Sequence, residues 1–235
     1  MWRRITSAVC VVLLAATLVS CGGGAFSFTG GNWSLQGTSS TSPGFNLGGN
    51  LTQNGSQLTG ALCYNTLVQC NGGTLQFSGT VIGKSTVLTA TAPDGSVVTL
   101  HLNGSSPTAA SGSYQIEQNS TTIDQGSVSG SFVPSLTGTW TGSSGGSNGI
   151  TFSGVFTQGQ PTADGSFQLS LTSVSATGGS CSITGGSGTG TIAGNILNVT
   201  QGFVLGAKIT DPATATSMNA SLSCDFLDTI MLTKQ

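Results

Sequence analysis

The hydrophobic positions of this chain recur at short intervals and often alternate with polar ones. Phe45, Leu47, Gly49, Leu51 and Gln53 fall on one face of an extended segment, a period of two that is typical of a half-buried β-strand. After the first twenty residues, no stretch has apolar residues at sustained helical spacing. The pattern therefore predicts an all-β protein built from many short strands.

The same strand patterns occur twice, in the same order. Three motifs return 105 to 111 residues further along the chain: G-x-W at 31–33 and 138–140, a segment ending in T-Q at 49–53 and 154–158, and a cysteine nine residues before G-T-x-x-G, at Cys70 and Cys181. We interpret this as two copies of one unit, at residues 29–133 and 135–235, joined near Pro134.

Each copy divides into about eight strands separated by turn residues such as Asn54-Gly55 and Asp94-Gly95, which tolerate the positive φ angles of tight hairpins. In the first copy we expect strands near 30–37, 44–53, 57–63, 74–82, 85–91, 96–103, 111–118 and 127–133. In the second copy we expect them near 136–142, 149–158, 165–174, 187–193, 196–201, 203–210, 217–224 and 227–233.

Sequential strands with short connections favour an up-and-down meander, and closure into a barrel removes the exposed sheet edges. The segment at 136–141, with its Trp140 near the start of a strand, resembles the opening of lipocalin and avidin barrels. The resemblance implies two tandem eight-stranded antiparallel barrels, with Trp33 and Trp140 as barrel-end plugs or as ligand-stacking platforms. Avidins bind biotin through additional tryptophans, whereas each copy here has one, so biotin binding is not expected.

Residues 1–20 have a basic start followed by an apolar run at 8–19, which is too short to span a membrane and is typical of a secretory signal. The sequence L-V-S-C at 18–21 resembles the lipobox of bacterial lipoproteins. This resemblance implies cleavage before Cys21, palmitate-type acylation of that residue and a tether at 21–28 that anchors the protein to a membrane. Glycines directly after the lipidated cysteine imply the outer membrane.

With Cys10 in the leader and Cys21 lipidated, four cysteines remain: Cys63, Cys70, Cys181 and Cys224. An even number in an exported protein indicates two disulfides, for which three pairings exist. Because Cys70 and Cys181 occupy equivalent positions, pairing within each copy is the more economical solution. We therefore predict Cys63–Cys70 and Cys181–Cys224, the longer loop giving the larger stabilisation.

Charged residues make up only 5% of the chain, and after the leader only three lysines remain against seven acids. No basic patch can form, which argues against nucleic-acid binding. His101 is the only histidine and lies in an alternating strand, so we expect a structural or solvated role. We expect neither a metal site nor a cofactor.

Two pairs of carboxylates are candidate functional groups, the first for glycoside hydrolysis and the second for binding a metal ion. Glu117 and Asp124 flank a polar hairpin, and Asp225 and Asp228 lie close together near the C-terminus. We interpret both pairs as solvated charges and expect no enzymatic activity, because acid–base groups are so scarce. Two function classes stay open: an envelope β-barrel protein that binds a small apolar or weakly polar ligand, and a structural or adhesion protein that contacts polysaccharide or envelope proteins.

Overall fold

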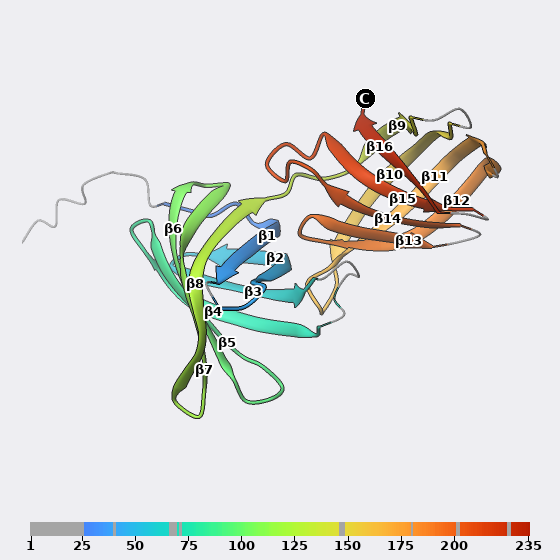
Figure 1. The fold of residues 1–235 in the computed structure, drawn as a ribbon. Helices are drawn as coiled ribbons and strands as arrows, with labels where there is room; N and C mark the ends of the chain where they lie inside the picture. The colour runs from blue at the N-terminus through green and yellow to red at the C-terminus, as the bar shows by residue number, and fades with distance from the viewer. Residues whose placement is uncertain are drawn as a thin grey trace, which may run out of the picture.

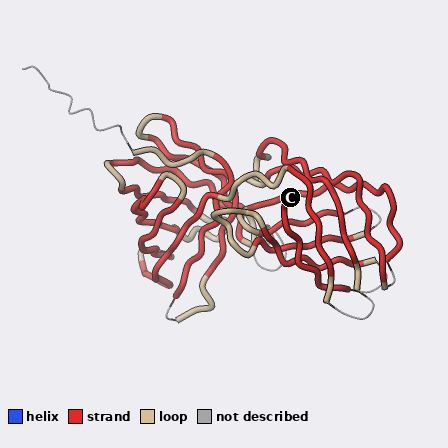
Figure 2. The backbone as a smooth tube through the Cα atoms, turned by 90° about the horizontal axis from the view of Figure 1, so that it is seen from above, coloured by secondary structure: helices blue, strands red, loops and turns tan. Residues whose placement is uncertain are grey.

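The structure, a computed structural model, is built from β-strands throughout its described part (Figure 2). It describes residues 26–39, 41–65, 70, 72–145, 149–179, 181–200, 203–224 and 227–235. The strands form two closed antiparallel barrels, one after the other along the chain (Figure 1). The all-β prediction of two tandem eight-stranded meander barrels is thereby confirmed.

The first barrel, called barrel 1, closes when its eighth strand pairs with its first. Its strands are β1 (Gly31–Ser39), β2 (Phe45–Asn54), β3 (Gln57–Tyr64), β4 (Thr74–Ile82), β5 (Ser85–Thr91), β6 (Val97–Ser106), β7 (Ala109–Gln118) and β8 (Thr121–Phe132). Each strand pairs with its neighbours in sequence, so the connections are hairpins and none crosses the barrel.

The second barrel, called barrel 2, has the same order and closes through the pairing of its last strand with its first. Its strands are β9 (Gly138–Ser143), β10 (Thr151–Pro161), β11 (Phe167–Gly178), β12 (Cys181–Ala193), β13 (Ile196–Thr200), β14 (Val204–Ile209), β15 (Ser217–Ser223) and β16 (Leu227–Lys234). The repeat in the sequence thus corresponds to a repeat in the fold.

Alternation along the strands places the apolar side chains inside. On β2, Phe45, Leu47 and Leu51 are buried, and on β10 the corresponding Phe152 and Phe156 are buried. A β-bulge at Gly154 interrupts the register between β10 and β11, where a side chain would collide with Leu171 and Phe152. The small residue therefore lets β10 bend without crowding the core.

Buried apolar side chains fill both interiors rather than leaving them as open calyces. The largest fully buried ones of barrel 1 are Trp33, Tyr114, Leu35, Leu51, Leu58, Leu62, Leu88 and Leu100. Those of barrel 2 include Trp140, Phe156, Leu136 and Ile150. Eight-stranded barrels are narrow enough for side chains to fill them, as these do.

The N-terminal edge of the described chain belongs to barrel 1. Phe28 is buried and packs edge-on against the indole of Trp33, and Phe26 packs in turn against Phe28. The backbone N–H of Thr29 donates to the carbonyl of Pro107. The last residues of the predicted tether therefore cover one end of the barrel, and barrel 1 begins before residue 29.

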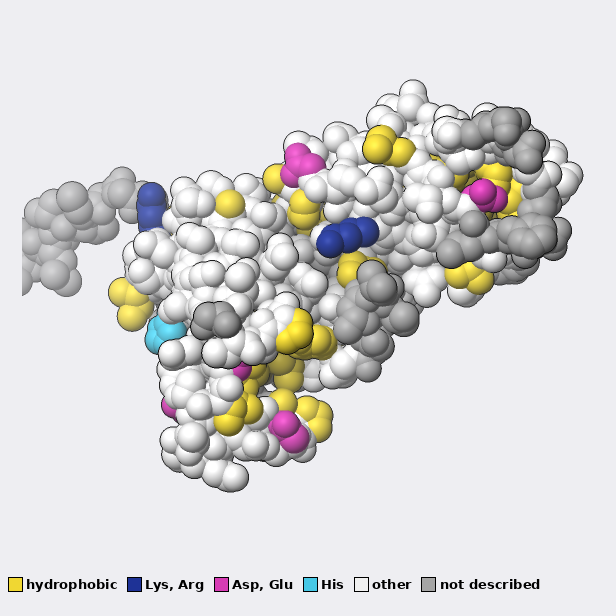
Figure 3. Space-filling model, in the orientation of Figure 1, with side chains coloured by type: hydrophobic (Ala, Val, Ile, Leu, Met, Phe, Trp, Pro, Cys, Tyr) yellow, Lys and Arg dark blue, Asp and Glu magenta, His cyan; other side chains and the backbone are white. Residues whose placement is uncertain are grey.

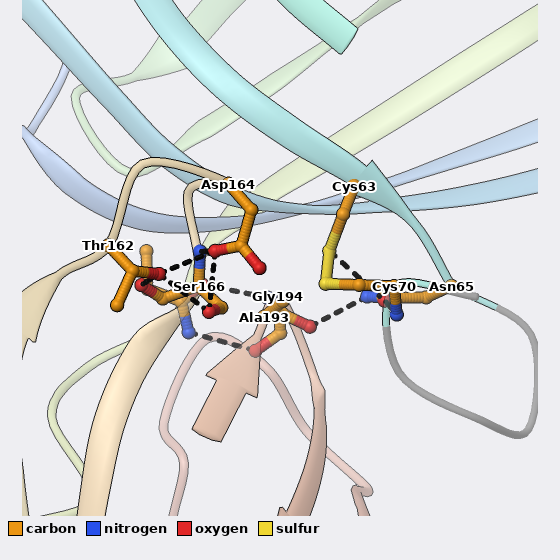
Figure 4. Close-up of a disulfide and its surroundings, with 9 residues drawn as sticks. Cys63, Asn65, Cys70, Thr162, Asp164, Ser166, Ala193 and Gly194 are labelled. Carbon is orange, nitrogen blue, oxygen red and sulfur yellow. Dashed lines mark hydrogen bonds between the residues drawn. A yellow bond between two sulfur atoms is a disulfide. The ribbon is translucent and has the colours of Figure 1, made fainter. Parts of the chain in front are cut away.

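The two barrels touch through two hairpin tips of barrel 2 and the outer face of β1 to β3. The Asn32 side-chain amide donates to the carbonyl of Gly194 at 2.9 Å and accepts from the Gly194 N–H at 2.7 Å. The side-chain amide of Asn65 donates to the carbonyl of Ala193 at 2.7 Å (Figure 4). Both asparagines are buried, so these bonds satisfy polar groups that would otherwise be costly.

Close backbone approach accompanies these hydrogen bonds. The turn between β10 and β11 lies so near β3 that a side chain on Gly165 would fall 1.8 Å from the carbonyl oxygen of Ala61. A side chain on Gly48 would fall 2.4 Å from Ala193. Small residues on both sides thus allow the barrels to meet backbone to backbone.

Candidate ligand-binding cleft

Both disulfides pair cysteines within one repeat, as predicted. Cys63, at the end of β3, is joined to Cys70. Cys181, the first residue of β12, is joined to Cys224 directly after β15. The first bridge lies beside Asn65, whose side-chain oxygen accepts a bond from the Cys70 N–H (Figure 4). It therefore supports a residue that holds the two barrels together.

The two repeat tryptophans are core residues. Trp33 and Trp140 are buried, and each indole N–H donates to the carbonyl four residues earlier, Thr29 and Leu136 respectively, at 2.8 Å. Trp140 also packs edge-on against Phe156. With rings buried and indole nitrogens satisfied, we assign both tryptophans to packing at the barrel ends and not to ligand contact.

The glutamine that ends the repeated motif has a role that the sequence did not reveal. Gln53 accepts a hydrogen bond from the Phe28 N–H at 2.8 Å, and Gln158 accepts one from the Leu136 N–H at 3.0 Å. In both barrels this glutamine holds, through a hydrogen bond, the segment that precedes the first strand. Its recurrence in the motif was the available signal.

His101 lies exposed on the outer face of β6, opposite Val87 on β5 and Ser113 on β7. No hydrogen bond joins its ring to a carboxylate among the described residues. A catalytic triad needs an acid that orients the histidine, and no carboxylate of the described chain takes this position.

Of the four candidate carboxylates, the structure describes Glu117, Asp124 and Asp228. Asp124 lies on β8, and Glu117 on β7 accepts a bond from Gln115 at 2.8 Å. Asp228 lies on β16, whereas Asp225 falls outside the described residues. In the part of the chain that the structure covers, no three His, Cys, Asp or Glu side chains gather closely enough to hold a metal ion.

Asp124 is the centre of a hydroxyl cluster on barrel 1. It accepts hydrogen bonds from Ser39 at 2.6 Å, Ser42 at 3.0 Å and Tyr114 at 2.9 Å, and from the Gln125 N–H. The Ser39 bond, more than the others, lowers the pKa of the Asp124 carboxyl below its ordinary value. The bonds from Ser39 and Ser42 to Asp124 join the end of β1 and the residues after it to β8.

The inter-barrel cleft has a different character. It is a partly open cavity of about 460 Å³ between the outer face of barrel 1 and the strands β14 and β15 of barrel 2. The wall from barrel 1 consists of Ser34, Gln36, Asn46, Ser129 and Ser131. The wall from barrel 2 consists of Asn195, Lys208, Ile209, Thr210, Pro212 and Asn219.

Strand register arranges the barrel 1 wall in two rows. Gln36 on β1 is flanked by Asn46 on β2 and Ser129 on β8, and Ser34 lies opposite Ser131 in the next row. Adjacent strands place such side chains about 5 Å apart. The wall is thus a regular grid of amides and hydroxyls.

These polar groups are uncommitted within the protein. No hydrogen bond inside the described chain engages the side chains of Gln36, Asn46, Asn195 or Asn219, in contrast to the buried amides of Asn32 and Asn65. Each free amide offers two donors and an acceptor. The cleft can therefore exchange several hydrogen bonds with a polar ligand.

A second, shallower groove, the threonine groove, crosses the outer face of β10 to β13. Thr157, Ser170, Thr189 and Thr200 form one row across the four strands by register, and all four line a space of about 620 Å³. The groove lies on barrel 2 alone. It is hydroxyl-rich, and among its described lining residues only Gln168 carries a side-chain amide, whereas such amides line both walls of the inter-barrel cleft.

Charged side chains are sparse on the face of the molecule that Figure 3 shows. The few acidic and basic side chains there lie apart from one another, and the apolar spots are small. The predicted lipidation site, Cys21, lies outside the described residues. Within those residues, no helix is long and apolar enough to cross a membrane.

Comparisons with known proteins give little. No protein-family model and no curated protein matches the chain. Among solved structures, it is similar to the Myxococcus xanthus hemagglutinin in complex with a3,a6-mannopentaose, with 12% identity over 87% of this chain and 100% of the other. The TM-score is 0.23, so a proposal for this chain has to rest on its own residues.

Proposed function

We propose that this protein is a non-enzymatic, lipid-anchored protein of the bacterial cell envelope that holds a polysaccharide chain in the inter-barrel cleft. The supporting observation is the lining of that cleft by uncommitted amides and hydroxyls on both walls. Sugar hydroxyls both donate and accept hydrogen bonds, as side-chain amides do. The volume of about 460 Å³ falls within the range of ordinary ligand sites.

Because side chains fill both barrel interiors, the inter-barrel cleft is a better candidate for the ligand site than the inside of either barrel. Leu35, Leu62, Leu88 and Leu100 are fully buried inside barrel 1, and Leu171 and Leu205 are fully buried inside barrel 2. A ligand inside either barrel would have to displace such side chains. The cleft needs no such displacement, because it is a cavity between the two barrels.

The absence of aromatic rings from the cleft lining sets the expected strength of binding. Without stacking on a sugar face, we expect a dissociation constant on the order of 1 mM per site. Many lipid-anchored copies facing one long polymer would raise the overall affinity by avidity. A weak site is thus sufficient for an adhesion protein.

Scarce acid–base chemistry supports the non-enzymatic part of the proposal. His101 is exposed and lacks a carboxylate partner, and both oxygens of Asp124 accept bonds from neighbouring hydroxyls. No carboxylate of the described chain lines the inter-barrel cleft, whereas glycoside hydrolysis uses two. The cleft is therefore suited to holding a chain rather than to cutting it.

The test is an NMR titration of the protein with oligosaccharides of dextran and of polygalacturonate. We expect the side-chain amide signals of Gln36, Asn46, Asn195 and Asn219 to shift on addition of at least one of them. The double variant Asn46→Ala/Asn219→Ala should weaken binding about tenfold, because two amides that lose a partner each contribute up to ~1 kcal/mol.

The matched control is Thr157→Ala/Thr189→Ala, which alters the threonine groove and leaves the cleft unchanged. It should bind as the unaltered protein does. Shifts confined to the threonine groove, or none with either oligosaccharide, would refute the cleft as the binding site.

A further inference from the structure

Of the described residues that line the inter-barrel cleft, one is charged, Lys208 on β14. By register it lies directly opposite Asn219 on β15 and Ile196 on β13. The cleft wall also includes Asn195, in the turn that leads into β13. An ammonium group and two side-chain amides therefore share one wall of the cavity.

Lys208 has no partner of its own. No ion pair or hydrogen bond within the described chain engages its ammonium group, whereas the ammonium of Lys234 donates to the carbonyl of Ser135 at 2.9 Å. Among the described residues, no Asp or Glu lines the cleft. The positive charge of Lys208 is thus free to act on a ligand.

The nearest acid in sequence, Asp211, is committed elsewhere. One of its oxygens accepts the Ala213 N–H at 3.1 Å and the other accepts the hydroxyl of Thr214 at 3.0 Å. Its carboxylate caps its own turn and does not appear in the cleft wall. The cleft is consequently a positive spot in a chain whose net charge is −2.

From this arrangement, and resting on the proposed function, we propose that the polysaccharide held in the cleft is an acidic one, whose anionic substituent pairs with Lys208. A carboxylate, sulfate or phosphate on the sugar would accept from the ammonium and from the amides of Asn195 and Asn219. The grid of Gln36, Asn46 and the serines on the opposite wall would take the neutral hydroxyls. The cleft would then recognise both the charge and the hydroxyl pattern of the polysaccharide.

The experiment compares a galacturonate tetrasaccharide with its methyl ester, which has the same backbone without the charge. We expect the acid to bind about tenfold more tightly at low salt, a difference of about 1.4 kcal/mol. This preference should shrink as salt is raised, because screening weakens an exposed ion pair and leaves neutral hydrogen bonds largely unaffected. Dextran sulfate and dextran form the second pair and separate sulfate from carboxylate recognition.

Two variants of Lys208 and one control variant of Lys84 assign the effect. Lys208→Met keeps the length of the side chain and removes the charge, so it should abolish the preference for the acid and leave binding of the ester unchanged. Lys208→Arg should retain the preference. Lys84→Met, which removes an exposed lysine from the turn between β4 and β5 of barrel 1, should change neither.

The outcomes distinguish this inference from the function on which it rests. Equal binding of acid and ester, or equal loss of both in Lys208→Met, would overturn the anion preference while leaving polysaccharide binding intact. Binding of none of the four oligosaccharides would overturn both.

Discussion

Single side chains in this protein fall into two groups, those that serve the fold and those left free for a ligand. Asn32 and Asn65 are buried, and the side-chain amide of each donates a hydrogen bond across the contact between the barrels. Gln36 and Asn46 have similar chemistry but keep their amides unengaged in the cleft. The sequence does not separate the two groups, because all four lie on or beside strands and directly next to an aromatic residue or a leucine.

Asp124 gives a prediction about acid stability. Its pKa in the folded protein is lowered from the ordinary value of 3.8, chiefly by the hydrogen bond from Ser39. A depressed carboxyl pKa stabilises the fold at pH values above about 4, and this stabilisation is lost as pH falls through the folded-state pKa. Asp124→Asn should therefore lower the free energy of unfolding at pH 7, by on the order of 1 kcal/mol given its contact with solvent.

The measurement is urea unfolding between pH 2 and pH 7. The difference between Asp124→Asn and the unaltered protein should shrink at the acid end of this range. Ser39→Ala should reduce the same pH-dependent part, because it removes the strongest donor. A difference that stays constant across the whole range would show that the cluster does not act through the charge of Asp124.

At the scale of elements, alternation and turn residues predict the strands well and their polar ends poorly. The expected strands at 74–82 and 85–91 match β4 and β5 in full. In contrast, β8 begins at Thr121 and β12 at Cys181, each six residues before the expected start. Both extensions are dominated by Thr, Ser, Gly and other polar residues, so no apolar period marks them. Pairing with a long neighbouring strand, a tertiary effect, decides where these strands begin.

The candidate site was less predictable than the strands. The recurring motifs predict the duplication and both disulfide pairings, and the strand pattern predicts closure. The motifs also include the glycine in the middle of β2 and of β10. The cleft is formed by residues from both repeats, such as Ser131 and Lys208, which no local pattern connects. Only the placement of one barrel against the other brings them together.

The same turn in two surroundings gives a prediction at this scale. Asp94-Gly95-Ser96 and Asp164-Gly165-Ser166 form matching turns, in which the aspartate accepts the serine N–H at 3.0 Å. The φ angles of the glycines are 82° and 85°. A side chain on Gly95 would meet nothing within 4 Å, whereas one on Gly165 would strike the Ala61 carbonyl. Gly95→Ala should lower the free energy of unfolding by about 1–2 kcal/mol, because only the left-handed backbone conformation opposes the added side chain.

Gly165→Ala should cost roughly 2–5 kcal/mol, because the collision with barrel 1 adds to the same backbone term. We also expect it to separate the barrels, which small-angle scattering would detect as a larger radius of gyration and NMR as changes at Asn32 and Asn65. Gly95→Ala is the matched control for both readouts. Equal effects of the two substitutions would mean that the turn does not hold the barrels together.

For the whole molecule, the proposed lipid anchor determines how the weak cleft can act. Cys21 lies only a few residues before Phe26, so a lipid there would hold barrel 1 close to the membrane surface. Binding to a polymer would then be multivalent across many anchored copies. Release from the membrane should therefore weaken attachment to a polysaccharide-coated surface far more than it weakens binding of a short oligosaccharide.

The variant Cys21→Ser tests the anchor directly. In a bacterial host it should not incorporate labelled palmitate and should leave the detergent phase for the aqueous phase. Cys10→Ser, which alters the other cysteine ahead of the barrels, should retain both label and partition. Labelling of the Cys21→Ser protein would show that the lipid, if present, is attached elsewhere.

The contact between the barrels is head-to-tail, since barrel 2 offers hairpin tips and barrel 1 offers an outer face. Such contacts between related units can continue without limit, adding one unit after another into a filament. Here a group needed for a further step is changed: Thr139 stands in barrel 2 where barrel 1 has Asn32, whose side chain bonds the hairpin tip at Gly194. We expect growth to stop at two units, so that duplication produced a bounded pair with one cleft instead of a fibre with many.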